Sequence, residues 1–185
     1  YCWGNPMVLV DLNGAWPQWI IDAFNGDGSE MPEWLERIIE GNEAHRLLQA
    51  RFMQDYSGRG GVVEYSVGSG VTRNVSGRGR ADIIYFNSMT RSAEVYEIKP
   101  LLTYGPGMLY HRQGVDQMRG YVFALNNNGS LYNGWVATPG ISLNGYFDSI
   151  VIPSKLYNGR KDIVYHVYEN GMITYFYRDR QPERQ

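Results

Sequence analysis

The sequence predicts an α/β domain, in which helices flank a mixed central sheet and further strands follow toward the C-terminus. Three observations lead to this prediction. The chain has 185 residues, of which 43% are hydrophobic and 14% aromatic, enough for one buried core. Its hydrophobic pattern runs in the order helix, three strands, helix, strands. Segments rich in Gly, Asn and Ser separate these elements.

Two helices are expected in the first third of the chain. Pro17 to Phe24 favours a short helix, which a Gly-containing loop ends. Ser29 is a suitable N-cap for a longer helix over residues 32–56, whose apolar side chains recur at helical spacing. Gly41 and Asn42 indicate that this longer pattern is divided into two helices.

Three strands and a further helix should follow. The strands are expected at residues 62–67, 81–86 and 93–99, which are rich in β-branched and aromatic residues. Residues 68–79 are rich in Gly and Ser and predict a loop between the first two strands. The next helix should run from about residue 111 to residue 125, where an Asn-rich segment stops it.

The last third of the chain predicts short strands only. They are expected at residues 134–138, 149–152, 163–168 and 172–177. The pattern leaves two arrangements open, because these strands either extend the core sheet or form a separate layer.

Composition excludes several classes of protein. No apolar run approaches the ~20 residues of a membrane span, so no membrane association is expected. The start of the chain lacks the basic region of a signal peptide. The single cysteine, Cys2, excludes an internal disulfide framework and a zinc site made only of cysteines.

Charge is unevenly distributed along the chain. The formal net charge of −2 excludes a uniformly basic nucleic-acid binder. Residues 1–43 carry eight acidic residues against one arginine, whereas residues 44–80 carry six arginines against two acidic residues. The basic segment either meets phosphates or neutralises the acidic one, and charge alone favours neither.

The strand at residues 93–99 carries the most informative side chains. Glu97 and Lys99 lie on one face because side chains alternate along a strand. Burying both charges is costly unless they pair or bind a ligand. Pro100 ends the strand, and Asp82 lies near the start of the preceding strand. Neighbouring strands can therefore bring Asp82, Glu97 and Lys99 together.

This set of side chains suits phosphodiester hydrolysis. Two carboxylates can hold Mg²⁺, or Mn²⁺, through oxygen ligands. Such a metal lowers the pKa of a bound water and neutralises charge on a phosphate. A lysine can orient the water or stabilise the transition state. The alternative is a solvated Glu–Lys pair, which is the more frequent meaning of E-x-K alone.

Four motifs resemble the PD-(D/E)XK nuclease superfamily. Asp82, followed after a short interval by the E-x-K of Glu97 and Lys99, is similar to its central signature, with Ala81 in place of proline. The G-x-x-x-H and Q-x-x-x-Y motifs of the RecB-type branch are matched by Gly41 to His45 and by Gln117 to Tyr121. VRR-Nuc domains share part of this spacing. The resemblance covers residues 41–125 and implies a restriction-endonuclease-like core, ordered α-β-β-β-α-β.

The resemblance also implies roles for individual residues. Asp82 and Glu97 would hold the metal, and Lys99 would position the attacking water. His45 would complete the metal site, with Glu43 as the alternative. Residues two apart lie roughly 200° apart around a helix, so the two are not expected to face one metal.

Substrate contacts are implied as well. Gln117 and Tyr121 would lie on one helical face and orient the substrate or the lysine. Four basic side chains are candidates for contact with nucleic-acid phosphates. They are Arg78, Arg80, His111 and Arg112.

The N-terminal segment resembles the end of an Rhs repeat-associated core. Asn5 and Pro6, Asp11 and Gly14 match its spacing, whereas Leu12 stands where the family has proline. The resemblance implies that residues 1–16 end an Rhs core, with Asp11 from a self-cleaving protease and cleavage just after Gly14. Residues 17–185 would then be a toxin domain. The alternative is an ordinary N-terminal arm with an Asn-Gly turn.

Together the resemblances imply a metal-dependent DNase, delivered as a type VI secretion effector into the cytoplasm of a target bacterium. Its expected partners are DNA, a cognate immunity protein and the Rhs shell of the parent polypeptide. The alternatives are an RNase toxin on the same fold, for example one that cleaves tRNA, a binding domain without cleavage, and another toxin chemistry. A deaminase is excluded, because its C-x-x-C zinc motif requires two cysteines.

Overall fold

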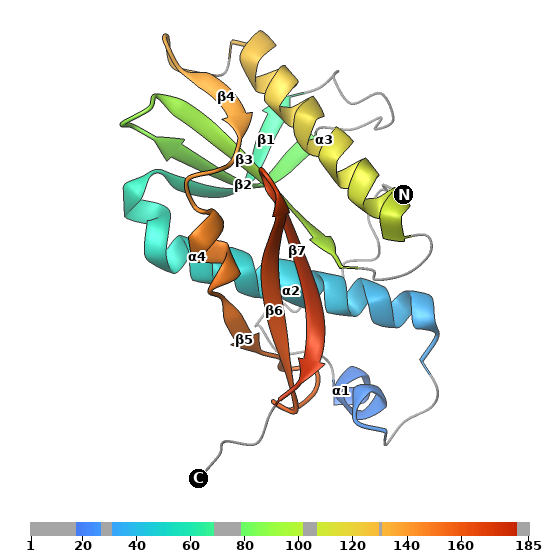
Figure 1. Cartoon of the computed structure of the whole chain (residues 1–185). Helices are drawn as coiled ribbons and strands as arrows, with labels where there is room; N and C mark the ends of the chain where they lie inside the picture. The colour runs from blue at the N-terminus through green and yellow to red at the C-terminus, as the bar shows by residue number, and fades with distance from the viewer. Residues whose placement is uncertain (1–17, 27–30, 69–78, 102–106, 130, 181–185) are drawn as a thin grey trace.

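A computed structural model describes residues 18–26, 31–68, 79–101, 107–129 and 131–180 and shows a mixed α/β structure (Figure 1). The predicted class is confirmed. The elements, in chain order, are α1 (Gln18–Phe24), α2 (Glu33–Tyr56), the 3₁₀ turn η1 (Ser57–Arg59), β1 (Gly61–Gly68), β2 (Gly79–Asn87), β3 (Ser92–Pro100), α3 (Gly107–Asn127), β4 (Val136–Pro139), α4 (Asn144–Asp148), β5 (Val151–Pro153), β6 (Lys161–Glu169) and β7 (Met172–Asp179).

The seven strands form one mixed sheet with β3 at its centre. The strand order is β1-β2-β3-β7-β6-β5, and β4 also pairs with β3. Residues 92–95 of β3 pair in parallel with β4, and residues 97–100 pair in parallel with β7. The other pairs are antiparallel. The C-terminal strands therefore extend the core sheet, which settles the choice left open by their pattern.

Helices α2 and α3 cover opposite faces of this sheet (Figure 1). Alternate residues of β3 belong to two separate hydrophobic clusters. Tyr96 and Ile98 pack in the cluster that includes Leu48 and Phe52 of α2. Val95 packs in the other cluster. To this cluster α3 contributes the buried residues Met118, Tyr121, Ala124 and Leu125. A side chain in a gap of the sheet can thus reach residues from both helices.

The long helix α2 is continuous, so the predicted division at Gly41 and Asn42 is wrong. A Cβ at position 41 would lie 3.2 Å from the hydroxyl oxygen of Tyr175, so this glycine permits close packing rather than a break. Pro32 precedes the helix without a side-chain cap. The helix passes into η1, and Gly60 follows with a φ of 91°.

The remaining predicted elements are confirmed with shifted ends. Helix α1 packs through Ile20 against Ile39 of α2 and Leu156. Helix α3 begins four residues before the expected start, and α4 was not expected. Within the described ranges, no helix is long and apolar enough to cross a membrane.

Several sequence predictions lie outside the described residues. These are the N-terminal segment with Asp11 and Gly14, the N-cap Ser29, and Arg78 in the loop before β2. His111 and Arg112 lie in the backbone of α3, but their side chains are also outside the described part of the chain.

Candidate active site

Strands β2 and β3 separate at Asp82. Their pairing runs from Asn87–Ser92 to Ile83–Tyr96. Beyond that pair the main-chain N–H of Ile98 donates a 2.7 Å hydrogen bond to Oδ2 of Asp82. The carboxylate of Asp82 therefore lies in the gap where the two strands diverge.

On its other side, Asp82 is also released from regular pairing. The pairing of β1 with β2 passes from Val63–Ile83 to Tyr65–Ala81 and omits Glu64. Glu64 has a φ of 50°, in the left-handed region that residues other than glycine rarely adopt. Nε2 of Gln49 donates to the carbonyl oxygen of Asp82 at 3.1 Å and to Oε1 of Glu64 at 2.7 Å. A side chain of α2 thus replaces a strand partner at Asp82.

Helix α2 also places His45 against Asp82. Nδ1 of His45 lies 3.5 Å from Oδ1 of Asp82. Burial is the largest single effect on the pKa of His45 and lowers it, but the charge of Asp82, the hydrogen bond with Asp82 and the charge of Glu97 together raise the pKa overall. For Asp82 burial raises the pKa, but the charges of His45 and Lys99 lower it overall. Each partner therefore favours the charged form of the other.

Strand β3 brings a second carboxylate to the gap. Glu97 is 1% exposed, and its Oε1 accepts a 2.5 Å hydrogen bond from Nζ of Lys99. Its Oε2 is buried and has no hydrogen-bond partner among the described residues. Burial, and then the charge of Asp82, raise the pKa of Glu97. Burial lowers the pKa of Lys99, but the charges of Glu97 and Asp82 raise it overall, so the lysine is a cation.

Helix α3 completes the cluster with Gln117 and Tyr121. Nε2 of Gln117 donates to the hydroxyl oxygen of Tyr121 at 2.5 Å, so the two residues share a helical face. Burial, and then the charge of Glu97, raise the pKa of Tyr121. At the start of β2, a Cβ on Gly79 would lie 2.8 Å from Cε1 of Tyr121. The glycine therefore allows the tyrosine to approach the strand that carries Asp82.

Glu43 lies elsewhere. Its Oε1 accepts hydrogen bonds from the main-chain N–H groups of Lys155 and Leu156, at 2.7 and 3.2 Å. Its Oε2 accepts from the hydroxyls of Ser154 and Tyr177, at 2.7 and 3.0 Å. These bonds join α2 to the turn after β5 and to β7. Of the two proposed third metal ligands, the structure places only His45 beside Asp82.

The basic candidates are only partly described. Arg80 is exposed on β2, and its Nη1 lies 4.0 Å from Oε2 of Glu64. Among the described residues its ion pair is with Glu64, and it makes no ion pair with Asp82 or Glu97. Gln49 was not identified from the sequence, although it lies four residues after His45, a spacing that places both on one face of α2.

The cluster fits a divalent cation in part. In the described part of the chain, no three His, Cys, Asp or Glu side chains are grouped to hold a metal ion. Asp82 and Glu97 nevertheless offer two carboxylates, and Oε2 of Glu97 is a buried acceptor to which no described residue donates. A cation would satisfy this oxygen and favour the ionised form of Glu97. Because His45 contacts Asp82, it lies beside the carboxylates rather than apart from them.

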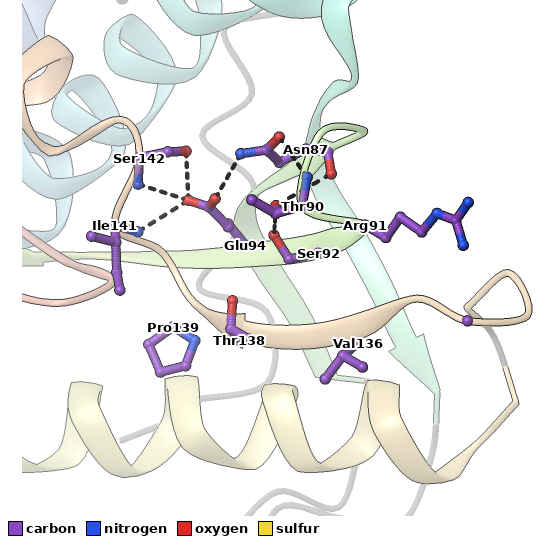
Figure 2. A pocket seen from close by; sticks show the side chains of 11 residues that line it. Asn87, Thr90, Arg91, Ser92, Glu94, Val136, Thr138, Pro139, Ile141 and Ser142 are labelled. Atoms are coloured by element: carbon purple, nitrogen blue, oxygen red, sulfur yellow. Dashed lines mark hydrogen bonds between the residues drawn. The ribbon is translucent and has the colours of Figure 1, made fainter.

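A cavity of about 510 Å³ lies at the other end of β3 (Figure 2). The carboxylate of Glu94 lies between Asn87 and Ser142, and Arg91 points away from it. Oε2 of Glu94 accepts from the main-chain N–H groups of Ile141 and Ser142, at 3.0 and 2.9 Å, and Nδ2 of Asn87 donates to Oε1 at 3.2 Å. Glu94 therefore holds the loop after β4 in place.

Comparison with protein-family models, with curated proteins and with solved structures finds no significant match. The choice of function then depends on the geometry of the site and on the sequence motifs.

Proposed function

We propose that this chain is a metal-dependent phosphodiesterase that cleaves DNA, on a restriction-endonuclease-like core of the PD-(D/E)XK type. One observation carries the proposal. Asp82, Glu97 and Lys99 meet where β2 and β3 separate, and a buried oxygen of Glu97 has no donor among the described residues. A buried ion pair with a purely structural role usually has all its polar atoms hydrogen-bonded. An unpaired carboxylate oxygen therefore favours a ligand-binding or catalytic role for this cluster.

In this proposal Asp82 and Glu97 hold Mg²⁺ or Mn²⁺, with His45 beside them. When bound, the metal supplies a Lewis acid and lowers the pKa of a water. Lys99 acts as a cation and not as a general base, because its pKa is raised by Glu97 and Asp82 against the effect of burial. Its ammonium stabilises the charge that grows on the phosphate. Gln117 and Tyr121 orient Lys99 or the substrate.

The proposed biological role comes from the N-terminal sequence. Residues 1–16 are proposed as the end of an Rhs core, cleaved just after Gly14, near Ala15 or Trp16, and residues 17–185 as a toxin domain. The toxin would act in the cytoplasm of a target bacterium, and an immunity protein would protect the producer. The spacing of Asn5, Pro6, Asp11 and Gly14 supports this role.

The test is incubation of the purified chain with plasmid DNA and with total RNA, in Mg²⁺, Mn²⁺ or EDTA. Glu97→Ala and Lys99→Ala are compared with Glu169→Ala and Lys155→Ala, which change the same residue types at exposed positions. We expect metal-dependent cleavage of DNA, lowered at least about 100-fold by the first two substitutions only. Cleavage of RNA alone would mean that the substrate is RNA and not DNA. No cleavage of either would refute the nuclease proposal.

A further inference from the structure

A buried glycine of α3 lies directly against Lys99. A Cβ built on Gly114 would lie 2.9 Å from Cγ of Lys99 and 2.6 Å from Cε of Met172. Both distances are shorter than real Cβ atoms show, so a larger residue requires one of these side chains to move. Gly114 is well inside α3, where glycine is a poor helix former.

The two side chains that meet Gly114 come from neighbouring strands. Lys99 is on β3 and Met172 is on β7, and the pairing of these strands places Met172 beside Glu97. Met172 is completely buried, so it cannot move outward without disturbing the sheet. The side chain of Lys99 has more room to move, because it is 22% exposed. A methyl group at position 114 would press on the end of Met172 and, at 2.9 Å, on the stem of Lys99, so the lysine has to shift even where the methionine yields.

Displacement of Lys99 would separate it from Glu97. Nζ of Lys99 donates to Oε1 of Glu97, so a shift of the stem at Cγ would carry the ammonium away from that oxygen. Glu97 is fixed by burial and has no alternative donor among the described residues for its second oxygen. The position of the helix backbone at residue 114 therefore sets where the ammonium lies.

We infer that Gly114 is a positioning residue, which lets α3 hold the stem of Lys99 so that its ammonium stays on Glu97. The inference rests on the proposed function for its effect on cleavage, but the geometry it describes can be tested separately. It adds a residue outside the motifs that identified the site.

The first measurement needs no variant. Brief acetylation of the wild-type chain with acetic anhydride, followed by mass spectrometry, compares Lys99 with the exposed Lys155. We expect Lys99 to react at least about ten times more slowly, since its amine is bonded to Glu97 and its stem is covered. Equal reactivity of the two lysines would overturn the inference.

The second measurement uses Gly114→Ala, with Gly145→Ala as the matched control. Gly145 lies in helix α4, and a Cβ there would meet nothing within 4 Å. In Gly114→Ala we expect Lys99 to become as reactive as Lys155 while kcat for DNA falls about 100-fold at similar KM, as for a catalytic group displaced by about 1 Å. The control should retain wild-type values of both.

Both assays are run well below the melting temperature of each variant, so that unfolded protein does not contribute. If Gly114→Ala does not fold, the double variant Gly114→Ala/Met172→Val is used. It removes the clash with Met172 and keeps the close approach of the new methyl group to Lys99. Slow acetylation of Lys99 in the folded variant would overturn the inference, whatever the value of kcat. A wild-type chain without nuclease activity would refute the proposed function and leave the acetylation result to decide the position of Lys99.

Discussion

Glu43 and His45 lie two residues apart on α2 and belong to different structures. His45 faces Asp82 at the separated strands, and Glu43 accepts four hydrogen bonds from the C-terminal region. Helical geometry predicted that only one of them faces the metal site. It could not decide which one, because the donors to Glu43 come from residues more than a hundred positions further along the chain.

Substitutions should separate these two roles. Glu43→Ala removes the acceptor of four donors, and we expect it to lower the free energy of unfolding by about 3 kcal/mol. His45→Ala should cost less, about 1 kcal/mol, because His45 makes a long contact with Asp82 and an edge-on ring contact with Tyr175, yet it should lower DNA cleavage. Urea denaturation and the plasmid assay measure the two effects. Equal destabilisation by both variants would contradict this assignment.

Glu94 should make stability depend on pH. Burial raises its pKa, but hydrogen bonds from Ser142 and Ile141 outweigh burial and lower the pKa below the ordinary value of 4.5. The folded protein then binds fewer protons than the unfolded chain, so ionised Glu94 stabilises the fold above pH 4.5. This contribution is lost as the pH falls through the lowered pKa.

The measurement is the difference in the free energy of unfolding between wild type and Glu94→Gln, obtained at several pH values. We expect the wild type to be more stable at pH 7, by about 2 kcal/mol for the weakened network. The difference should shrink as the pH falls below 4.5. A difference that stays constant from pH 7 to pH 3 would mean that the charge of Glu94 does not contribute.

Among the elements, β4 has its outer edge protected by one side chain. Nδ2 of Asn126 donates to the carbonyl oxygen of Ala137 at 3.0 Å, and the N–H of Ala137 donates to Oδ1 of Asn126 at 2.7 Å. An amide from the end of α3 thus replaces a neighbouring strand. Unpaired edges otherwise invite pairing with other chains.

Asn126→Ala should expose this edge. We expect a loss of about 1–2 kcal/mol and faster hydrogen exchange at the N–H of Ala137, because both bonds disappear. Asn127→Ala is the matched control, since Nδ2 of Asn127 donates to the carbonyl oxygen of Phe123 in its own helix. Similar exchange at Ala137 in the two variants would contradict the role of Asn126.

Local pattern predicted most elements correctly and failed where distant residues decide. The strands at 81–86 and 93–99 are rich in β-branched and aromatic residues and were placed to within two residues. Gly41 was misread as a helix break, because its reason for being small is Tyr175, far along the chain. The short helix α4 has no strong periodic signal, and its buried Phe147 packs with residues of α2 and β3.

At the scale of the whole molecule, β3 is shared between two parts of the sheet. Its first half pairs with β4, and the half with Glu97 and Lys99 pairs with β7. The sequence predicted that Asp82, Glu97 and Lys99 meet, because adjacent antiparallel strands require only a short turn. It did not predict that the strands separate there, since this depends on Gln49, Glu64 and the position of β7.

Removal of residues 161–185 should therefore abolish the fold and not only the C-terminal strands. Deletion of β6 and β7 removes Ile163, Met172 and Ile173 from the core, each worth about 1.5–3 kcal/mol. With the lost strand pairing this approaches the ~5–15 kcal/mol stability of a whole domain. We expect no cooperative thermal transition by circular dichroism. A cooperative transition with intact helix content would show that β7 is dispensable.

The pairing of Glu97 with Met172 also has a consequence for the order of events during synthesis. Strand β3 leaves the ribosome long before β7, and a contact between segments so far apart forms late and slowly. Until β7 is in place, the half-strand with Glu97 and Lys99 lacks its parallel neighbour, and Met172 does not lie beside Glu97. On the proposed function, a nascent chain is therefore expected to be inactive in the cell that makes it, and the proposed immunity protein would be needed only after translation has passed β7.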